Sequence, residues 1–195
     1  MARTHRIAIV IAAAAAVGLT LAGCVPGAEP TPTASHTTTP TPTATTDPQP
    51  QSEGEATAAA ELAIADFLYI RGQVNAAGGT DTAPLEEIAT DRALQLAIDD
   101  AGRIAEGGLR TEGQISFTPT LSYANTLENS TTNIPFGYAS VVGCQDGSSY
   151  KIFNSDGTPA QQPTQLRNEI QFDVIWDPAV ELWLVYKVVV TGASC

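Results

Sequence analysis

Histidine is almost absent from the sequence, although its side chain is the one best suited to proton transfer near neutral pH. The 195 residues contain two histidines, His5 and His36, and none lies in residues 53–195. That stretch therefore lacks Ser-His-Asp and Cys-His nucleophilic sites, histidine acid–base catalysis and histidine-bearing zinc sites. Asn154–Gly157 matches a calcium loop only in part and is interpreted as a hairpin turn. We expect no catalytic residue, no metal site and no cofactor.

Cysteine is the second residue type in this sequence whose placement carries chemical information. One of the three cysteines closes the segment Leu21–Cys24 (LAGC), which ends an apolar stretch, Ile7–Leu21, that follows Arg3 and Arg6. A cationic start, a short apolar region and a small-residue cleavage site form the layout of a signal peptide. Its last four residues resemble the lipobox of bacterial lipoproteins. The resemblance implies cleavage before Cys24, a lipid on its sulfur, and an anchor at the outer face of the cell membrane.

Two other interpretations of the N-terminus fit the sequence less well. A transmembrane anchor needs roughly 20 apolar residues, whereas residues 7–22 are fewer and include Gly18 and Thr20. An ordinary secretory signal would leave the complete four-residue match to chance. Lipidation explains the whole segment, and two or more acyl chains anchor a protein stably where one chain is marginal.

Composition divides the chain into a signal peptide (1–23), a lipidated Cys24 with a stalk (24–52) and a globular domain (53–195). The stalk is rich in Thr and Pro and has no large apolar residue after Val25. It cannot bury enough surface to offset its ordering entropy, so we expect it to be disordered. The formal charge is −12 and becomes −14 without residues 1–23, which carry two arginines and no acid. This acidity argues against a nucleic-acid partner.

Cys144 and Cys195 are the cysteines of the globular domain. If a lipid occupies Cys24, these two remain, and the compartment outside the membrane permits oxidation. Cys144 is expected to end a strand and Cys195 to follow the last strand. A disulfide would therefore hold the C-terminus, and we predict this bond. The alternative is two unpaired thiols.

Helical patterns open the globular domain. Ser52 and Glu55 have the spacing of a capping box, and the Ala-rich segment after them ends at Gly78-Gly79. Its apolar residues lie on more than one helical face, so we expect other elements to wrap it. A cleaner amphipathic helix, with apolar residues at i, i+3 and i+4 spacing, then runs to Gly107-Gly108.

Beyond residue 108 the apolar period changes to two, which is typical of half-buried strands. Pro119 marks an edge position or a bulge in the first of them. Helices first and strands afterwards, joined by hairpin-length turns, indicate an α+β domain with an antiparallel sheet. The expected strands are residues 115–127, 136–144, 170–176 and 182–190.

This order of elements, ending in a strand that contains Trp183, resembles the cone-shaped fold of nuclear transport factor 2. More narrowly, the chain resembles small lipoproteins of single-membrane bacteria with that fold. The resemblance covers about Ala56 to Cys195 and rests on element order, on the lipobox–stalk–domain layout and on the two domain cysteines. It implies N-terminal helices packed on a curved, roughly four-stranded antiparallel sheet.

Ketosteroid isomerases share this fold and use an Asp base and a Tyr-containing oxyanion hole in the mouth of the cone. By that resemblance Tyr69, Tyr123 and Tyr138 form a candidate pocket, with Asp66 or Asp173 as base. The alternative is that the strand tyrosines are core residues with one satisfied hydroxyl each, and that Asp66 solvates its helix.

We therefore expect a lipid-anchored cell-surface protein with a non-catalytic binding or envelope-associated domain. The alternative is a small enzyme or apolar-ligand carrier that uses the open end of the cone. A transport-type solute-binding protein is disfavoured, because one small domain lacks the two lobes that close around a solute. A hollow cone with a buried Asp would favour the enzyme or carrier, and a filled core would favour the binding domain.

Overall fold

The computed structural model describes residues 49–128 and 133–195. The predicted signal peptide, Cys24 and residues 24–48 of the predicted stalk lie outside this part of the chain. The helices are α1 (Glu53–Ala76), α2 (Ala83–Glu86) and α3 (Asp91–Glu106). The strands are β1 (Arg110–Glu112), β2 (Ser116–Glu128), β3 (Asn133–Asp146), β4 (Lys151–Phe153), β5 (Arg167–Asp177) and β6 (Leu182–Val190).

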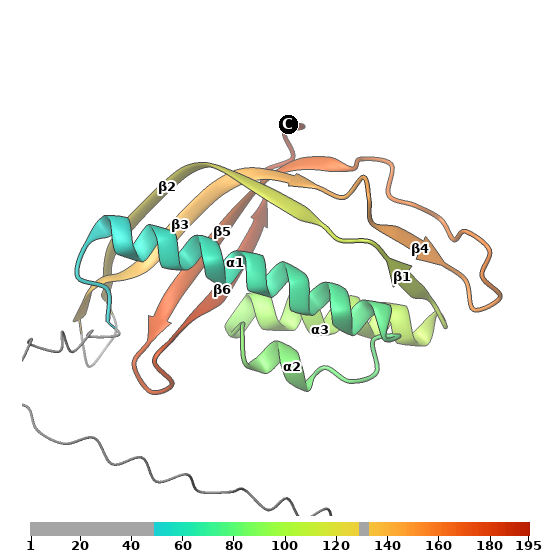
Figure 1. The fold of residues 1–195 in the computed structure, drawn as a ribbon, viewed down its shortest axis with the longest axis horizontal. Helices are drawn as coiled ribbons and strands as arrows, with labels where there is room; N and C mark the ends of the chain where they lie inside the picture. The colour runs from blue at the N-terminus through green and yellow to red at the C-terminus, as the bar shows by residue number, and fades with distance from the viewer. Residues whose placement is uncertain (1–48, 129–132) are drawn as a thin grey trace, which may run out of the picture. The chain divides into compact units, whose positions relative to one another are not determined.

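The helices pack on one face of a four-stranded antiparallel sheet, so the predicted α+β class is confirmed. The strand order is β2-β3-β5-β6, and β1 pairs with β4 in a separate two-stranded sheet. Figure 1 shows β2 and β3 arching over α1, with the β1–β4 pair at the far end. Strands that are consecutive within the larger sheet lie side by side, as short connections require.

Hydrogen bonds and one close approach define the two ends of α1. Ser52 caps the helix as predicted, because its Oγ accepts a hydrogen bond from Glu55 N at 3.2 Å. The Glu55 carboxylate in turn accepts from Gln51 N at 2.9 Å, so donors at the helix start are satisfied. After the last turn, Gly79 has φ +72°, and a Cβ there would lie 2.1 Å from Ala101 O of α3. Only glycine fits where the chain passes α3.

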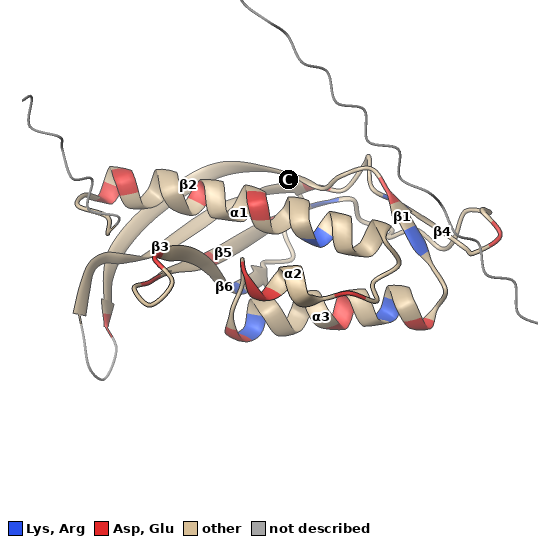
Figure 2. Cartoon of the chain, turned by 60° about the horizontal axis from the view of Figure 1, so that its bottom comes forward, with Lys and Arg blue, Asp and Glu red and all other residues tan. Residues whose placement is uncertain are grey.

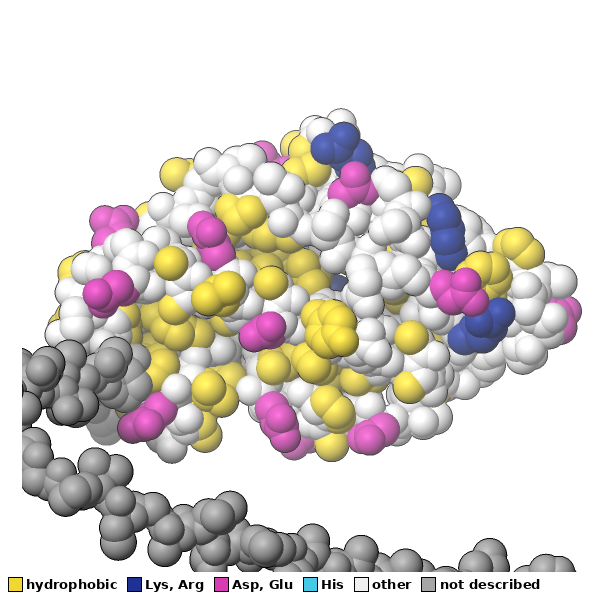
Figure 3. Space-filling view, in the orientation of Figure 1, with side chains coloured by type: hydrophobic (Ala, Val, Ile, Leu, Met, Phe, Trp, Pro, Cys, Tyr) yellow, Lys and Arg dark blue, Asp and Glu magenta, His cyan; other side chains and the backbone are white. Residues whose placement is uncertain are grey.

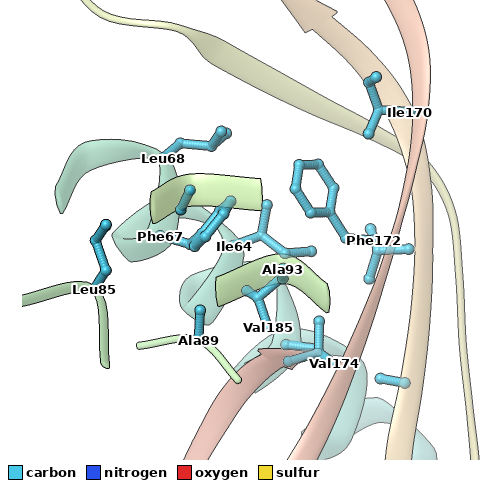
Figure 4. Packing of buried hydrophobic residues seen from close by; sticks show 14 of the residues in the cluster. Ile64, Phe67, Leu68, Leu85, Ala89, Ala93, Ile170, Phe172, Val174 and Val185 are labelled. Atoms are coloured by element: carbon cyan, nitrogen blue, oxygen red, sulfur yellow. The ribbon is translucent and has the colours of Figure 1, made fainter. Parts of the chain in front are cut away.

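Apolar side chains fill the space between the helices and the sheet. Phe67 of α1 and Phe172 of β5 are fully buried, and their rings meet edge-on with centroids 6.3 Å apart. Phe117 of β2 meets Phe172 in the same way at 5.0 Å. Figure 4 shows helix and strand side chains pointing into this shared space. The interior between the helices and the sheet is therefore filled by one cluster of buried apolar side chains.

The two edges of the larger sheet differ. On the β6 edge, Thr90 N donates to Val185 O at 2.9 Å and Val185 N donates to Ile88 O at 3.1 Å. On the other edge, β2 pairs only with β3 among the described residues. Pro119 lies on this edge strand, next to a register shift between Pro119 and Leu121. Both expectations for Pro119, an edge position and a bulge, are met.

Two predicted strands are longer in the structure. β3 begins at Asn133 rather than at residue 136, and β5 covers Arg167–Asp177 rather than residues 170–176. The hydrogen-bonded pairing of these strands continues beyond their apolar residues. The apolar pattern indicates only the part of a strand that has a buried face, so it underestimates the length of the strand. The β1–β4 pair was not predicted, because strands of three residues are too short to show a period.

Cys144 and Cys195 form the predicted disulfide, with a distance of 5.7 Å between their Cα atoms. Cys144 lies on β3 and Cys195 follows β6. The tail between β6 and the bond also pairs with β5, since Thr191 N donates to Glu169 O at 3.1 Å and Glu169 N donates to Ala193 O at 2.9 Å. Among the described residues no helix is long and apolar enough to cross a membrane.

Candidate functional site

The structure separates the five candidate pocket residues into two groups. Asp66 and Tyr69 lie on α1, and both are exposed. Tyr123, Tyr138 and Asp173 lie on the sheet face that points away from the helices, because their neighbours along the strands belong to the core. The interpretation that Asp66 solvates its helix fits its exposure. The helix residues and the strand residues therefore do not form one pocket.

Asp173 is the centre of a buried polar cluster on that outer face. Its side chain is well covered, with 5% relative exposure of the residue. The carboxylate accepts hydrogen bonds from Ser140 Oγ at 3.0 Å and from Gln171 Nε2 at 2.8 Å. Lys187 Nζ lies 3.8 Å from the other carboxylate oxygen. The cluster therefore joins β3, β5 and β6 through one satisfied charge.

The Tyr138 hydroxyl adds a further hydrogen bond to this carboxylate. Burial raises the pKa of Tyr138 well above its ordinary value, and the hydrogen bond to Asp173 raises the pKa further. Tyr138 therefore remains a neutral donor at physiological pH. A general base needs a carboxylate oxygen that a substrate can reach, but neither residue lines any of the three main cavities of the described domain. The contacts of Asp173 link β3, β5 and β6 of the sheet.

The largest of these cavities is an open groove between α1 and β2, with a volume of about 590 Å³. Phe117 lies on the groove wall from the β2 side, and its contact with the buried Phe172 holds it in place. Ser122 Oγ donates to Glu61 Oε1 at 2.7 Å and ties β2 to α1. We call this cavity the α1 groove; its helix wall includes Ala58, Leu62, Ala65 and Tyr69.

The expectation that other elements wrap α1 is wrong along this wall. Leu62 is 69% exposed and Tyr69 is 55% exposed. Leu62 also lines a second cavity of about 380 Å³ on the other side of α1, beside Trp183 of β6. The uncovered apolar surface is therefore continuous across the helix. Apolar side chains on more than one face of the helix were the sequence signal for this surface, but that pattern does not distinguish a buried face from an exposed one.

Acidic side chains accompany this surface. Glu61 lines the α1 groove, and Asp66 and Glu87 line the neighbouring cavity. Neither cavity is lined by Lys or Arg. Figure 3 shows hydrophobic side chains gathered over the middle of this face with acidic ones among them, while the basic side chains lie toward the right-hand part. Figure 2 shows the same division along α1, whose acidic residues all precede its single arginine, Arg71.

The described residues contain no group of three or more His, Cys, Asp or Glu side chains placed to hold a metal ion. Beside its apolar walls, the α1 groove is lined by the polar residues Glu61, Gln114 and Ser116, and the neighbouring cavity by Asp66 and Glu87.

Comparison with known proteins gives a distant structural likeness. No protein-family model matches the chain, and no curated protein matches it. One similar solved structure is the intermembrane space region of the chloroplast protein ARC6. It is 14% identical, the match covers 72% of this chain and 98% of that one, and the TM-score is 0.46. At that distance neither a family nor a function follows for this chain.

Proposed function

We propose that this chain is a lipid-anchored protein of the outer face of the cell membrane, and that its domain binds a partner without catalysis. The anchor is the lipid on Cys24, and residues 24–52 form the stalk. The binding surface is the α1 groove, and its partner presents an apolar segment flanked by Lys or Arg. The domain is a divergent form of the nuclear transport factor 2 fold, for which the element order is the support.

One observation carries the binding proposal: α1 leaves an apolar stripe in solvent. Ala58, Leu62, Ala65 and Tyr69 follow each other at spacings of four, three and four residues, so they lie on one helical face. Large contiguous apolar surface on a soluble domain marks an interaction site. Here the stripe also borders a groove whose opposite wall is β2.

Charge selects the kind of partner. With Glu61, Asp66 and Glu87 around the surface and no basic side chain in either wall, the local field is negative. A cationic segment would be attracted, and an anionic lipid headgroup or an acidic peptide would be repelled. A small apolar molecule is the alternative occupant of the same groove, and the test below separates the two.

The proposal is tested by binding of model peptides to the full chain held in nanodiscs of zwitterionic lipid. We expect an amphipathic Leu/Lys helix to bind and the matching Leu/Glu helix to bind far more weakly. Leu62→Gln should weaken Leu/Lys binding about tenfold, because one leucine contributes roughly 1.5–3 kcal/mol when it becomes buried. Leu121→Gln is the control, because Leu121 is similarly exposed (58%) but lines neither cavity.

Three results would contradict the proposal. One is equal binding of the two peptides, and another is an equal loss of binding in both variants. The third is preferential uptake of a neutral fatty alcohol over the Leu/Lys peptide, which would favour the carrier. If the domain were instead an enzyme that uses the Asp173 carboxylate as its base, Asp173→Asn would abolish its activity.

The anchor is tested separately by mass spectrometry of the protein from its native host. We expect an N-terminal peptide that begins at Cys24 and carries a lipid. An unmodified Cys24 peptide, together with identical membrane association of Cys24→Ala, would refute lipidation and leave the α1 groove untouched.

A further inference from the structure

A cavity between α1, α3 and the segments around the β1–β4 pair is lined by basic side chains, unlike the two cavities beside α1 described above. Its volume is about 400 Å³, within the range of small-molecule sites. The basic residues are Arg71 of α1 and Arg103 of α3; Asn75 and Tyr150, joined by a hydrogen bond of 3.1 Å, also line it. Residues 53–195 contain 7 Lys or Arg against 19 Asp or Glu. Two of the few basic side chains of the domain therefore meet in one hollow, which we call the arginine cavity.

A single carboxylate holds both arginines. Arg71 Nη2 lies 2.5 Å from Asp100 Oδ2, and Arg103 Nη2 donates to Asp100 Oδ1, the other oxygen of the same group. The two guanidinium groups are therefore close to each other. No other charged residue of the described chain lines the arginine cavity, so its charged side chains have a net charge of +1.

Both guanidinium groups keep donors for a ligand. The side chain of Arg103 is 65% exposed, and among the described residues Asp100 is its only partner. Arg71 is more enclosed, with 18% of its side chain exposed, and its Nε is buried. Arg71 Nη1 also has no partner in the described chain, but it is not one of the enclosed atoms. The donors left for a ligand are therefore Arg71 Nη1 and the Arg103 guanidinium.

Two side-chain amides line the same cavity. Gln145 and Asn168 lie opposite each other where β3 pairs with β5, so their side chains are neighbours on one face of the sheet. Neither amide makes a hydrogen bond within the described residues, and each can both donate and accept. Leu109, Ile115 and Leu166 add apolar surface. The lining therefore combines positive charge, a pair of amides and apolar side chains.

We propose that the arginine cavity binds a small monocarboxylic acid that also carries an amide and an apolar side chain. This is the chemistry of an N-acyl amino acid and of the last residue of a peptide. Guanidinium groups match the geometry of a carboxylate, and a net charge of +1 matches one carboxylate rather than a phosphate group of about −1.5 to −2. Gln145 and Asn168 pair with the amide of the ligand. The site is independent of the α1 groove and of the lipid anchor.

The test is calorimetric titration of the full chain with N-acetyl-leucine and with N-acetyl-leucinamide, in which a neutral amide replaces the carboxylate. We expect N-acetyl-leucine to bind at least about tenfold more tightly, because hydrogen bonds to a charged group are stronger than neutral ones. Its binding should shift the side-chain amide NMR signals of Gln145 and Asn168. The peptide acetyl-Ala-Ala-Leu separates the two sources of this chemistry. Tighter binding than N-acetyl-leucine indicates a peptide C-terminus, and weaker binding indicates a free small molecule.

Arg103→Gln leaves Arg71 and Asp100 as a balanced pair, so it should weaken N-acetyl-leucine binding about tenfold. Arg103→Lys keeps the charge and should lose less. Arg92→Gln is the matched control, because it removes the same charge from an exposed position of α3 that lines none of the three main cavities. Leu62→Gln, which tests the α1 groove, should leave N-acetyl-leucine binding unchanged, so failure of one proposal is distinguishable from failure of the other.

Thermal unfolding checks that the Arg103 variants fold. The proposal is overturned by equal binding of the acid and its amide, or by an equal loss of binding in Arg103→Gln and Arg92→Gln. It is also overturned if inorganic phosphate binds more tightly than N-acetyl-leucine. Absence of heat with both carboxylates, together with unchanged amide signals of Gln145 and Asn168, would overturn it as well.

Discussion

Removal of the Cys144–Cys195 disulfide should lower the free energy of unfolding substantially. The bond closes a loop with a sequence separation of 51 residues. In the chain-entropy model, opening a loop of that length costs about 4 kcal/mol at room temperature. Fraying of the tail after β6 in the variant would return some entropy to the native state, so we expect a loss of about 2–4 kcal/mol. That is a large part of the roughly 5–15 kcal/mol by which domains of this size are stable.

The assay is urea unfolding of the full chain, followed by tryptophan fluorescence. The double variant Cys144→Ser/Cys195→Ser should unfold at lower urea than wild type, and wild type treated with a phosphine reductant should match the variant. The slope of free energy against urea should rise, because the unfolded chain without the crosslink exposes more surface. Cys24→Ser is the matched control and should change neither quantity. A loss below about 1 kcal/mol would refute the entropic reasoning, and free thiols in denatured, unreduced wild type would refute the bond.

Three further predictions concern the ends of α1 and the outer face of the sheet. Gly79→Ala should cost at least about 2 kcal/mol more than Gly78→Ala in urea unfolding. Both glycines have positive φ, but only at Gly79 would the new Cβ meet backbone, that of Ala101. Ser52→Ala should cost about 1 kcal/mol through loss of the cap, and equal midpoints would contradict the Glu55 N contact. Because the pKa of Tyr138 is raised in the folded state, the unfolded chain loses that proton first as pH rises, and stability should fall above about pH 10. Tyr138→Phe should flatten this fall in thermal unfolding, and an unchanged slope would argue against the shift.

Local sequence signals predicted the elements well. Ser52 with Glu55 indicated where α1 begins, and Pro119 indicated an edge position or a bulge. Both signals concern a backbone N–H group. The Ser52 side chain accepts a hydrogen bond from a free N–H at the helix start, and Pro119 has no N–H to donate. The strand at Leu182–Val190 was predicted with the bounds that the structure has, because its apolar residues extend over the same stretch as its hydrogen-bonded pairing with β5.

The sites were harder to predict than the elements. The sequence placed Tyr123, Tyr138 and Asp173 on strands, but the side of the sheet that the helices cover is decided by packing and not by the period of two. The exposure of Leu62 and Tyr69 could not be predicted either, since an apolar helix face has the same sequence pattern whether other elements cover it or not. The cavity at Arg71 and Asn75 is also lined by residues far along the chain, such as Tyr150. No local pattern contains that information.

The unequal edges of the sheet determine how copies of this domain can meet. A free strand edge is a template for another chain, and a sheet open on both sides can add copies without limit. Here the Ile88–Thr90 segment already occupies part of the β6 edge, at Val185, whereas β2 pairs only with β3 among the described residues. A contact made by β2 alone on each side closes at two molecules, and Pro119 offers no N–H to it.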